Sequence, residues 1–183
     1  GKGTSFEGGQ RVPCVMQWPA MIAPNSVSGK LASTIDLLPT IAEITGAELP
    51  NHKIDGVSIL PLLKGDVSAN PREVLYYYYG RNDLEAIRYK HWKLIFPHIS
   101  RSYQGVLPGN DGWPGPYRRD TVVMGLYDLR RDPGEYYDVQ ELYPEVIEEI
   151  MKIAEEARSD LGDRLTGVEG TGRRSPGRVT EPN

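Results

Sequence analysis

The chain has 183 residues, and 25 acidic against 21 basic side chains give it a formal net charge of −4. This length fits one domain, or one domain and part of another, and a composition of 39% hydrophobic and 25% charged residues argues against wholesale disorder. No apolar run reaches the roughly 18 residues of a membrane-spanning helix, and the mild acidity argues against a general nucleic-acid binder, which would show a basic face.

The first part of the chain is predicted to contain loop, strand and helix. It opens in a glycine-rich turn without an initiator Met, which indicates a piece of a longer protein. Residues 11–18 are predicted to form a short buried strand, with the single cysteine, Cys14, as a small core residue. Residues 33–46 are predicted to form a helix that ends at Gly46, because apolar side chains repeat along it at helical spacing: Leu37, Leu38, Ile41 and Ile44.

The middle of the chain is rich in strand signals. A boundary is expected near 66–72, where the pattern changes from loop and helix to strand. Four runs are predicted to be strands because β-branched or aromatic residues dominate them and turn-like residues separate them: 73–79, 85–89, 92–96 and 126–129. The second and third are close enough to form a hairpin around Lys90-His91, and residues 132–135 form a turn after the fourth.

The clearest helix is predicted at residues 144–161. Pro144 suits a first helical turn, apolar residues repeat at helical spacing, and Gly162 ends the pattern. We expect its apolar stripe to cover one face of the antiparallel strands. From Leu165 onward the chain is rich in Gly, Arg, Pro and Thr, and it is expected to be extended or loosely ordered.

Residues 100–124 form a long connection with no helical or strand period. Connections longer than about 12–15 residues are usually functional or disordered. Its side chains include chemistry that suits binding, in Tyr103, Trp113, Tyr117, Arg118 and Arg119, although an insertion packed on its own aromatic residues is the plainer interpretation. His98 stands at the mouth of the connection, where a ligand contact and plain packing are both open.

Other polar residues give weaker signals. Lys2 stands between two glycines, so it can offer a compact positive charge to an anion, but the P-loop ending is absent and a surface lysine is the simpler interpretation. The three histidines show no zinc spacing, and the acidic residues around 128–135 lack EF-hand spacing. No Ser-His-Asp set can be identified.

Four segments together resemble a known family. Residues 1–13, followed by Trp18-Pro19, resemble the second signature block of the arylsulfatase-type sulfatases. The similarity continues through 33–40 and 55–58, and it ends with 126–129 and the turn at 132–135. The blocks occur in the family's order and cover roughly residues 1–162.

The resemblance implies a fold. Family members have a large α/β domain, followed by a small four-stranded antiparallel sheet packed with a C-terminal helix. The chain is then an α+β fragment, in which residues 1–68 are the C-terminal portion of the large catalytic domain. Residues 69–162 would be the small C-terminal α+β domain, and residues 163–183 an extended tail.

The resemblance also implies a chemistry, the hydrolysis of a sulfate ester by a formylglycine nucleophile with calcium. By its place in the motif, Lys2 resembles the lysine that contacts the sulfate, and His98, Tyr117 and Arg118 are candidate substrate-binding residues. Val15-Met16-Gln17 follows Cys14, which does not match the Cys/Ser-x-Pro-x-Arg motif of the nucleophile. The nucleophile, the active-site histidines and the calcium ligands are therefore expected before Gly1. No cofactor is expected in this chain, which alone should be inactive.

Two alternatives stay open at this point: a phosphonate or phosphate ester hydrolase of the same superfamily, and a non-catalytic binding module on the sulfatase scaffold. The expected partners are a small-molecule or glycan sulfate ester and the missing N-terminal part of the same chain, with no nucleic acid and no membrane span. Because many members of the family are exported, the resemblance points to a periplasmic or secreted protein without deciding the compartment.

Overall fold

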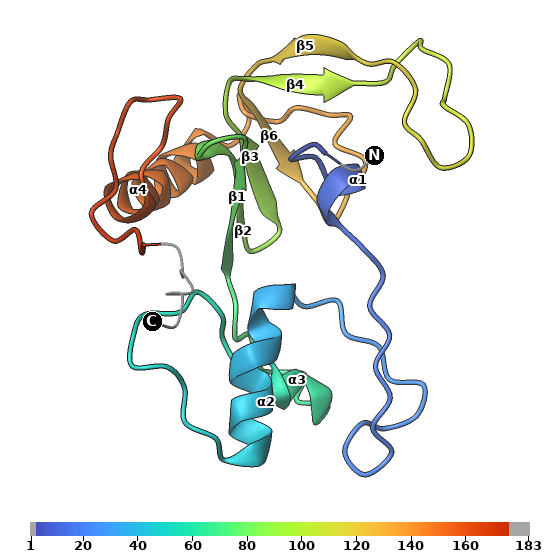
Figure 1. Ribbon diagram of the computed structural model, residues 1–183, viewed down its shortest axis with the longest axis vertical. Coiled ribbons are helices and arrows are strands. Elements are labelled where there is room, and N and C mark those ends of the chain that lie inside the picture. Colours follow the sequence, from blue (N-terminus) through green and yellow to red (C-terminus); the bar gives the residue numbers. More distant parts are fainter. Residues whose placement is uncertain (1–2, 176–183) are drawn as a thin grey trace, which may run out of the picture. The chain divides into compact units, whose positions relative to one another are not determined.

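The computed structural model describes residues 3–175 (Figure 1). The chain divides into two compact units, one formed by Gly1–Arg11 with Tyr76–Asn183 and the other by Val12–Leu75. Residues 3–11 therefore pack with the sheet that follows them much later in the sequence. The boundary after residue 68 was predicted from the domain order of a family, and this division into compact units does not test it, so it stays a prediction.

The first unit is built on a four-stranded antiparallel sheet, as predicted. The strand order is β1 (Val74–Tyr79), β2 (Asp83–Tyr89), β3 (Trp92–Ile95) and β6 (Gly125–Asp128). The predicted hairpin is confirmed, since Tyr89 pairs with Trp92 across it and Lys90 takes the left-handed φ of 56° that a tight turn needs.

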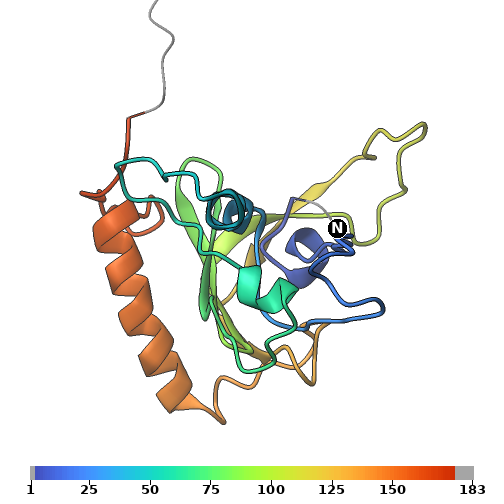
Figure 2. The same ribbon diagram turned by 90° about the horizontal axis from the view of Figure 1, so that it is seen from below.

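The core of this unit lies between the sheet and helix α4 (Pro144–Leu161), which Figure 2 shows beside the strands. The helix matches the prediction at both ends, and Gly162 donates its backbone N–H to the carbonyl of Arg158. The largest apolar side chains of this unit are fully buried, and each contributes about 1.5–3 kcal/mol: Leu84, Ile87, Leu94, Ile95, Leu126 and Ile150.

The connection predicted for residues 100–124 is only partly irregular. Its ends form a two-stranded antiparallel sheet from β4 (His98–Ser102) and β5 (Arg118–Val122). Both strands consist mostly of polar or charged residues, so the alternation that identifies a half-buried strand is absent from the sequence. The two strands pair through backbone hydrogen bonds, which residues of almost any type can form, so the amino-acid composition does not reveal the hairpin.

The stretch after α4 was expected to be extended, but its first part folds back on the helix. Asp163 and Val168 form an isolated bridge, and the backbone N–H groups of Thr171 and Gly172 donate to carbonyls in the last turn of α4. The buried carboxylate of Asp163 organises this turn, because it accepts hydrogen bonds from the backbone N–H of Leu84 and from the Arg158 side chain. Residues 176–183 lie outside the described residues.

The second unit holds a 3-10 turn (Thr34–Asp36) that leads into α2 (Leu37–Thr45), followed by the short helix α3 (Leu60–Leu63). Asp36, fully buried, joins these elements: its carboxylate accepts hydrogen bonds from the backbone N–H groups of Ser33 and Val57 and from the Arg72 guanidinium. Burial by itself would raise the pKa of Asp36, but Arg72 and the two amides outweigh it and lower that pKa.

The predicted strand at residues 11–18 and the predicted burial of Cys14 are wrong. Residues 11–18 form no strand; Val15 is 95% exposed, and Cys14 is exposed rather than in a core. A strand needs a neighbouring strand, and none lies beside this segment in residues 3–175. The apolar stripe of α2 is also exposed, with Ile41 at 56%, while Pro39, Thr40 and Ala42 pack inward.

Between residues 3 and 175, no helix combines the length and the apolar character that crossing a membrane requires.

Candidate functional site

The N-terminal segment is fastened to the sheet by a buried ionic cluster, which we define as Glu7, Lys93 and Glu135. The ammonium of Lys93, a fully buried residue on β3, lies 3.1 Å from the carboxylate of Glu7 and 2.9 Å from that of Glu135. Glu135 also accepts the backbone N–H of Glu7 at 2.5 Å, and the ammonium stands over the ring of Tyr77 at 4.7 Å.

The electrostatics of this cluster depend on the lysine. Burial raises the pKa of Glu135, and Lys93 acts in the opposite direction. Burial likewise raises the pKa of the neighbouring Tyr77. The short helix α1 (Glu7–Gln10), which carries Glu7, is thereby held against the sheet. Gln10 adds a hydrogen bond from its amide to the hydroxyl of Tyr79 at 2.6 Å.

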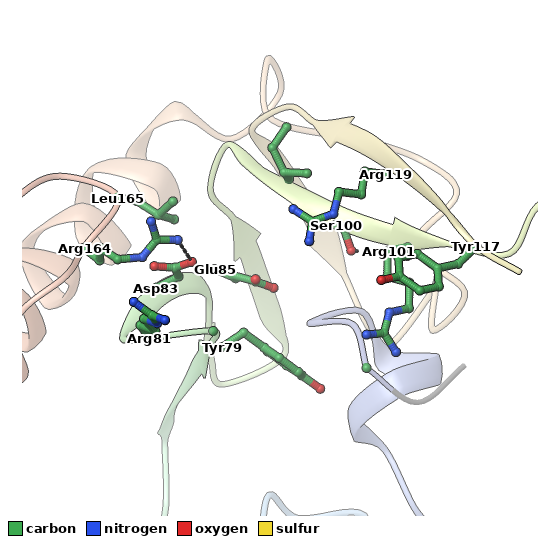
Figure 3. A pocket seen from close by; sticks show the side chains of 13 residues that line it. Tyr79, Arg81, Asp83, Glu85, Ser100, Arg101, Tyr117, Arg119, Arg164 and Leu165 are labelled. Atoms are coloured by element: carbon green, nitrogen blue, oxygen red, sulfur yellow. Dashed lines mark hydrogen bonds and ion pairs between the residues drawn. The ribbon is translucent and has the colours of Figure 1, made fainter. Parts of the chain in front are cut away.

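This anchoring places the start of the described chain at a pocket of about 670 Å³. Four segments of the first unit line it: Gly3 of the N-terminal segment, the β1–β2 hairpin, the β4–β5 hairpin and the turn after α4 (Figure 3). Gly3 has a φ of 99°, a backbone conformation that favours glycine. Among the charged residues of the lining, basic ones outnumber the two acidic ones: Arg81, Arg101, Arg119 and Arg164.

The acidic side chains of the pocket already have partners. Asp83 accepts a hydrogen bond from the guanidinium of Arg164, and a carboxylate oxygen of Glu85 lies 3.2 Å from Nε2 of His98. Burial raises the pKa of Glu85, and the neighbouring His98 counteracts that shift. The pocket therefore offers little negative charge to a ligand.

Three arginines are left without an acidic partner among residues 3–175: Arg81, Arg101 and Arg119. The guanidinium of Arg101 lies over the ring of Tyr117, 4.5 Å from the ring centroid. Guanidinium groups match the geometry of sulfate, phosphate and carboxylate oxygens. The arrangement is thus suited to binding an anion.

The candidates named from the sequence fall in different places. Lys2 lies outside the described residues, although Gly3, its neighbour in sequence, lines the pocket. Tyr117 lines the pocket. His98 is buried, with Nδ1 2.7 Å from the carbonyl oxygen of Phe96, so the structure gives it a packing environment.

Arg118 is not among the lining residues, and its guanidinium lies 3.9 Å from the carboxylate of Asp120. Successive side chains of a strand point to opposite faces, so Tyr117 and Arg119 face the pocket and Arg118 faces away. The sequence marked both arginines as able to bind, and the one chosen as a substrate-binding candidate, Arg118, is the one that does not line the pocket.

Sequence reasoning missed most of this site. Arg119 was named with the long connection, but Arg81, Arg101 and Arg164 were not, because they are far apart in the chain and nothing in their local sequence marks them as neighbours. Lys93 did carry a signal: it is a charged residue inside the apolar run 92–96, and such a residue is buried only with a partner. The sequence gives no indication that the partners are Glu7 and Glu135.

Calcium has no site among the described residues. Between residues 3 and 175, no group of three or more His, Cys, Asp or Glu side chains is arranged to hold a metal ion. The acidic groups of the pocket are bound to Arg164 and His98, and those of the buried cluster to Lys93. These residues do not fit a calcium ion, and we assign them no step that uses one.

Comparisons with known proteins identify the family. Residues 2–104 match the family described as N-sulphoglucosamine sulphohydrolase, C-terminal, and residues 70–169 match the C-terminal region of aryl-sulfatase. The chain is 36% identical over 165 residues to arylsulfatase A of Bos taurus, an alignment that covers 84% of this chain and 31% of the relative. It is 35% identical over 147 residues to steryl-sulfatase of Mus musculus, covering 74% of this chain and 23% of the relative.

Solved structures agree with these matches. The PsFucS1 sulfatase from Pseudoalteromonas sp. superposes with a TM-score of 0.68 and 25% identity, covering 85% of this chain and 31% of that one. The chain spans about a third of the length of the curated relatives it matches, such as arylsulfatase A. The family matches, the four-stranded antiparallel sheet and the C-terminal helix agree, and the chain belongs to the sulfatase family as the C-terminal part of an arylsulfatase-type member.

Proposed function

We propose that the full-length protein carrying this chain is a sulfuric ester hydrolase that releases sulfate from an organic sulfate ester. The observation that carries this proposal is the anion-suited pocket, which the glycine-rich N-terminal segment borders and which Arg81, Arg101 and Arg119 line. The named relatives, arylsulfatase A and steryl-sulfatase, act in the same chemical class by their names.

The chain's own residues would bind and orient the substrate. Lys2 would contact the sulfate as a compact positive charge, next to Gly3 at the edge of the pocket. The arginines would neutralise negative charge on the substrate in fixed positions, which reduces the reorganisation needed when further charge develops in the transition state. The buried cluster of Glu7, Lys93 and Glu135 would hold the N-terminal segment in place at the edge of the pocket.

The reacting groups are proposed to come from an N-terminal part of the protein. A formylglycine would supply the nucleophile and calcium would neutralise oxyanion charge. Cys14 does not match the motif of the nucleophile, and the described residues offer no metal cluster. We therefore propose that the 183-residue chain alone is inactive.

The test is an assay of the full-length protein with p-nitrocatechol sulfate and, separately, p-nitrophenyl phosphate. We expect sulfate release that EDTA abolishes. Lys2→Ala should lower kcat/KM by about 100-fold, the usual order for the loss of one group that stabilises an oxyanion. Lys152→Ala, a change at an exposed position of α4, is the matched control and should leave kcat/KM unchanged.

Two results would refute the proposal. Turnover of the phosphate ester alone would identify a phosphate ester hydrolase on the same scaffold. Absence of turnover with both esters, in a protein that binds sulfated ligands, would identify a binding module.

A further inference from the structure

We propose that the arginine-lined pocket selects glycan substrates that carry at least two anionic groups, sulfate or carboxylate, and that Arg119 and Arg81 are specificity-determining residues. This inference rests on the proposed function and deepens it, because it names the class of sulfate ester. Four features of the pocket support it: its size, the placement of its charges, a cross-strand arginine pair and its aromatic walls.

The pocket is larger than one anionic group requires. Its volume of about 670 Å³ lies within the range of about 300–1,000 Å³ that is typical of sites for drug-sized ligands. A disaccharide has that size. A ligand that filled the pocket would therefore reach several lining side chains at once.

The positive charges line different sides of the pocket. In the close-up view, Arg81 and Arg164 lie on one side, whereas Arg119, Arg101 and Tyr117 lie on the other (Figure 3). Arg164 is engaged by Asp83, which leaves Arg81 on the first side and Arg119 on the second without an acidic partner in residues 3–175. One ligand that satisfies both sides needs two separated anionic groups.

The β4–β5 hairpin holds two of these arginines in an unfavourable arrangement. Arg101 and Arg119 are direct partners across the antiparallel pair, so their side chains project from the same face. Like charges directly opposite each other destabilise a sheet. The guanidinium of Arg101 lies over the ring of Tyr117, and no carboxylate among residues 3–175 forms an ion pair with either arginine. A bound anion would remove this repulsion.

Aromatic side chains provide the remaining contact surface. Tyr79 and Tyr117 both line the pocket, and the hydroxyl of Tyr79 is held by Gln10. Aromatic faces pack against the apolar C–H surface of a sugar ring and lose little conformational entropy on binding. Aromatic faces beside arginines therefore suit a charged sugar better than a compact inorganic anion.

The test uses the full-length protein and calorimetric titration in EDTA with three disaccharides: one disulfated, one with a single sulfate and a carboxylate, and one with a single sulfate and no other charge. We expect both doubly charged disaccharides to bind at least tenfold more tightly than the third. Arg119→Gln and Arg81→Gln should each weaken the doubly charged ligands about tenfold, because each removes a charge-assisted hydrogen bond. Either change should alter binding of the singly charged ligand less than twofold.

Arg118→Gln is the matched control, since it removes the same charge from the same strand on the face away from the pocket. Its affinities should stay within twofold of the unmodified protein. Equal behaviour of the Arg118 and Arg119 variants, or equal affinity for all three disaccharides, would overturn the inference; the second result would mean that other parts of the full-length protein already neutralise the arginines. Hydrolysis of p-nitrocatechol sulfate by the same variants, assayed without EDTA and with added calcium, tests the proposed function separately.

Discussion

Replacing Lys93 with Met should destabilise the protein strongly, because it leaves the buried carboxylate of Glu135 without its cation and leaves Glu7 with only the Arg88 guanidinium, 3.9 Å away. The Lys93 side chain is 0% exposed, and those of Glu7 and Glu135 are 4% and 2% exposed. Removing one partner of a buried ion pair costs about 3–5 kcal/mol, since the remaining charge keeps its desolvation penalty. Against a typical total stability of about 5–15 kcal/mol, this loss is large.

The loss should depend on pH with a definite sign. Burial already raises the pKa of Glu135, and without Lys93 that pKa should rise further. A carboxyl group whose pKa is higher in the folded than in the unfolded state adds stability below its unfolded pKa, and this stability is lost as pH rises through the folded pKa. Lys93→Met should therefore be most harmful at pH 7.5 and less harmful at pH 5, where Glu135 can take up a proton.

The assay is urea unfolding followed by tryptophan fluorescence, with Trp92 as a reporter because its ring lies 4.7 Å from that of Tyr143. Lys152→Met, at an exposed position of α4, should change the free energy of unfolding by less than about 0.5 kcal/mol. Adding Glu135→Gln to Lys93→Met should recover part of the loss. A loss below about 1 kcal/mol at pH 7.5, or one that is equal at both pH values, would refute the reasoning.

Two further predictions concern the second unit. Asp36→Asn should cost about 3–5 kcal/mol at pH 7, because it removes the charge that Arg72 neutralises. The pKa of Asp36 is lowered, so the stability that its ionised carboxylate contributes is present above its unfolded pKa of about 4 and is lost as pH falls through its folded pKa. When the free energy of unfolding is measured at a series of acidic pH values, the variant should not show this loss. Gly56→Ala should lower the thermal midpoint by several degrees, because its Cβ would lie 2.1 Å from a backbone oxygen, whereas Gly29→Ala, with nothing within 4 Å, should not. Equal midpoints for the two alanine variants would contradict the packing described for Gly56.

The sheet and the main helices could be predicted because their signals are local. The hairpin at Lys90-His91 has strand-forming runs close on both sides, and the helix Pro144–Leu161 has a proline start, an apolar stripe and a glycine stop. Each of these features is set by residues near one another in sequence. The family resemblance added the order of the elements, and the family matches confirm that resemblance.

Elements that depend on distant partners could not be predicted. Residues 11–18 have the composition of a strand, but a strand forms only where another strand pairs with it. The prediction for the β4–β5 hairpin fails in the opposite way, since its polar residues are typical of a loop while its backbone forms an antiparallel ladder. Arg118 and Arg119 differ by one position, and only the direction of the strand decides which of them lines the pocket.

The buried cluster shows the same limit. Lys93 joins residues of α1 and of the turn after β6, so its partners lie 86 and 42 residues away in the chain. The sequence allows us to infer that Lys93 is charged and buried. Its partners can be identified only once the sheet has formed and brought the distant segments together. That contact nevertheless positions the N-terminal segment on which the proposed function depends.

The most direct test of the central proposal compares sulfate release from p-nitrocatechol sulfate by the full-length protein and by the 183-residue chain alone. We expect the full-length protein to release sulfate in a reaction that EDTA stops and that Lys2→Ala slows by about 100-fold, and we expect the chain alone to release none. Sulfate release by the chain alone, or full activity of the Lys2→Ala protein, would contradict the proposed division of the active site.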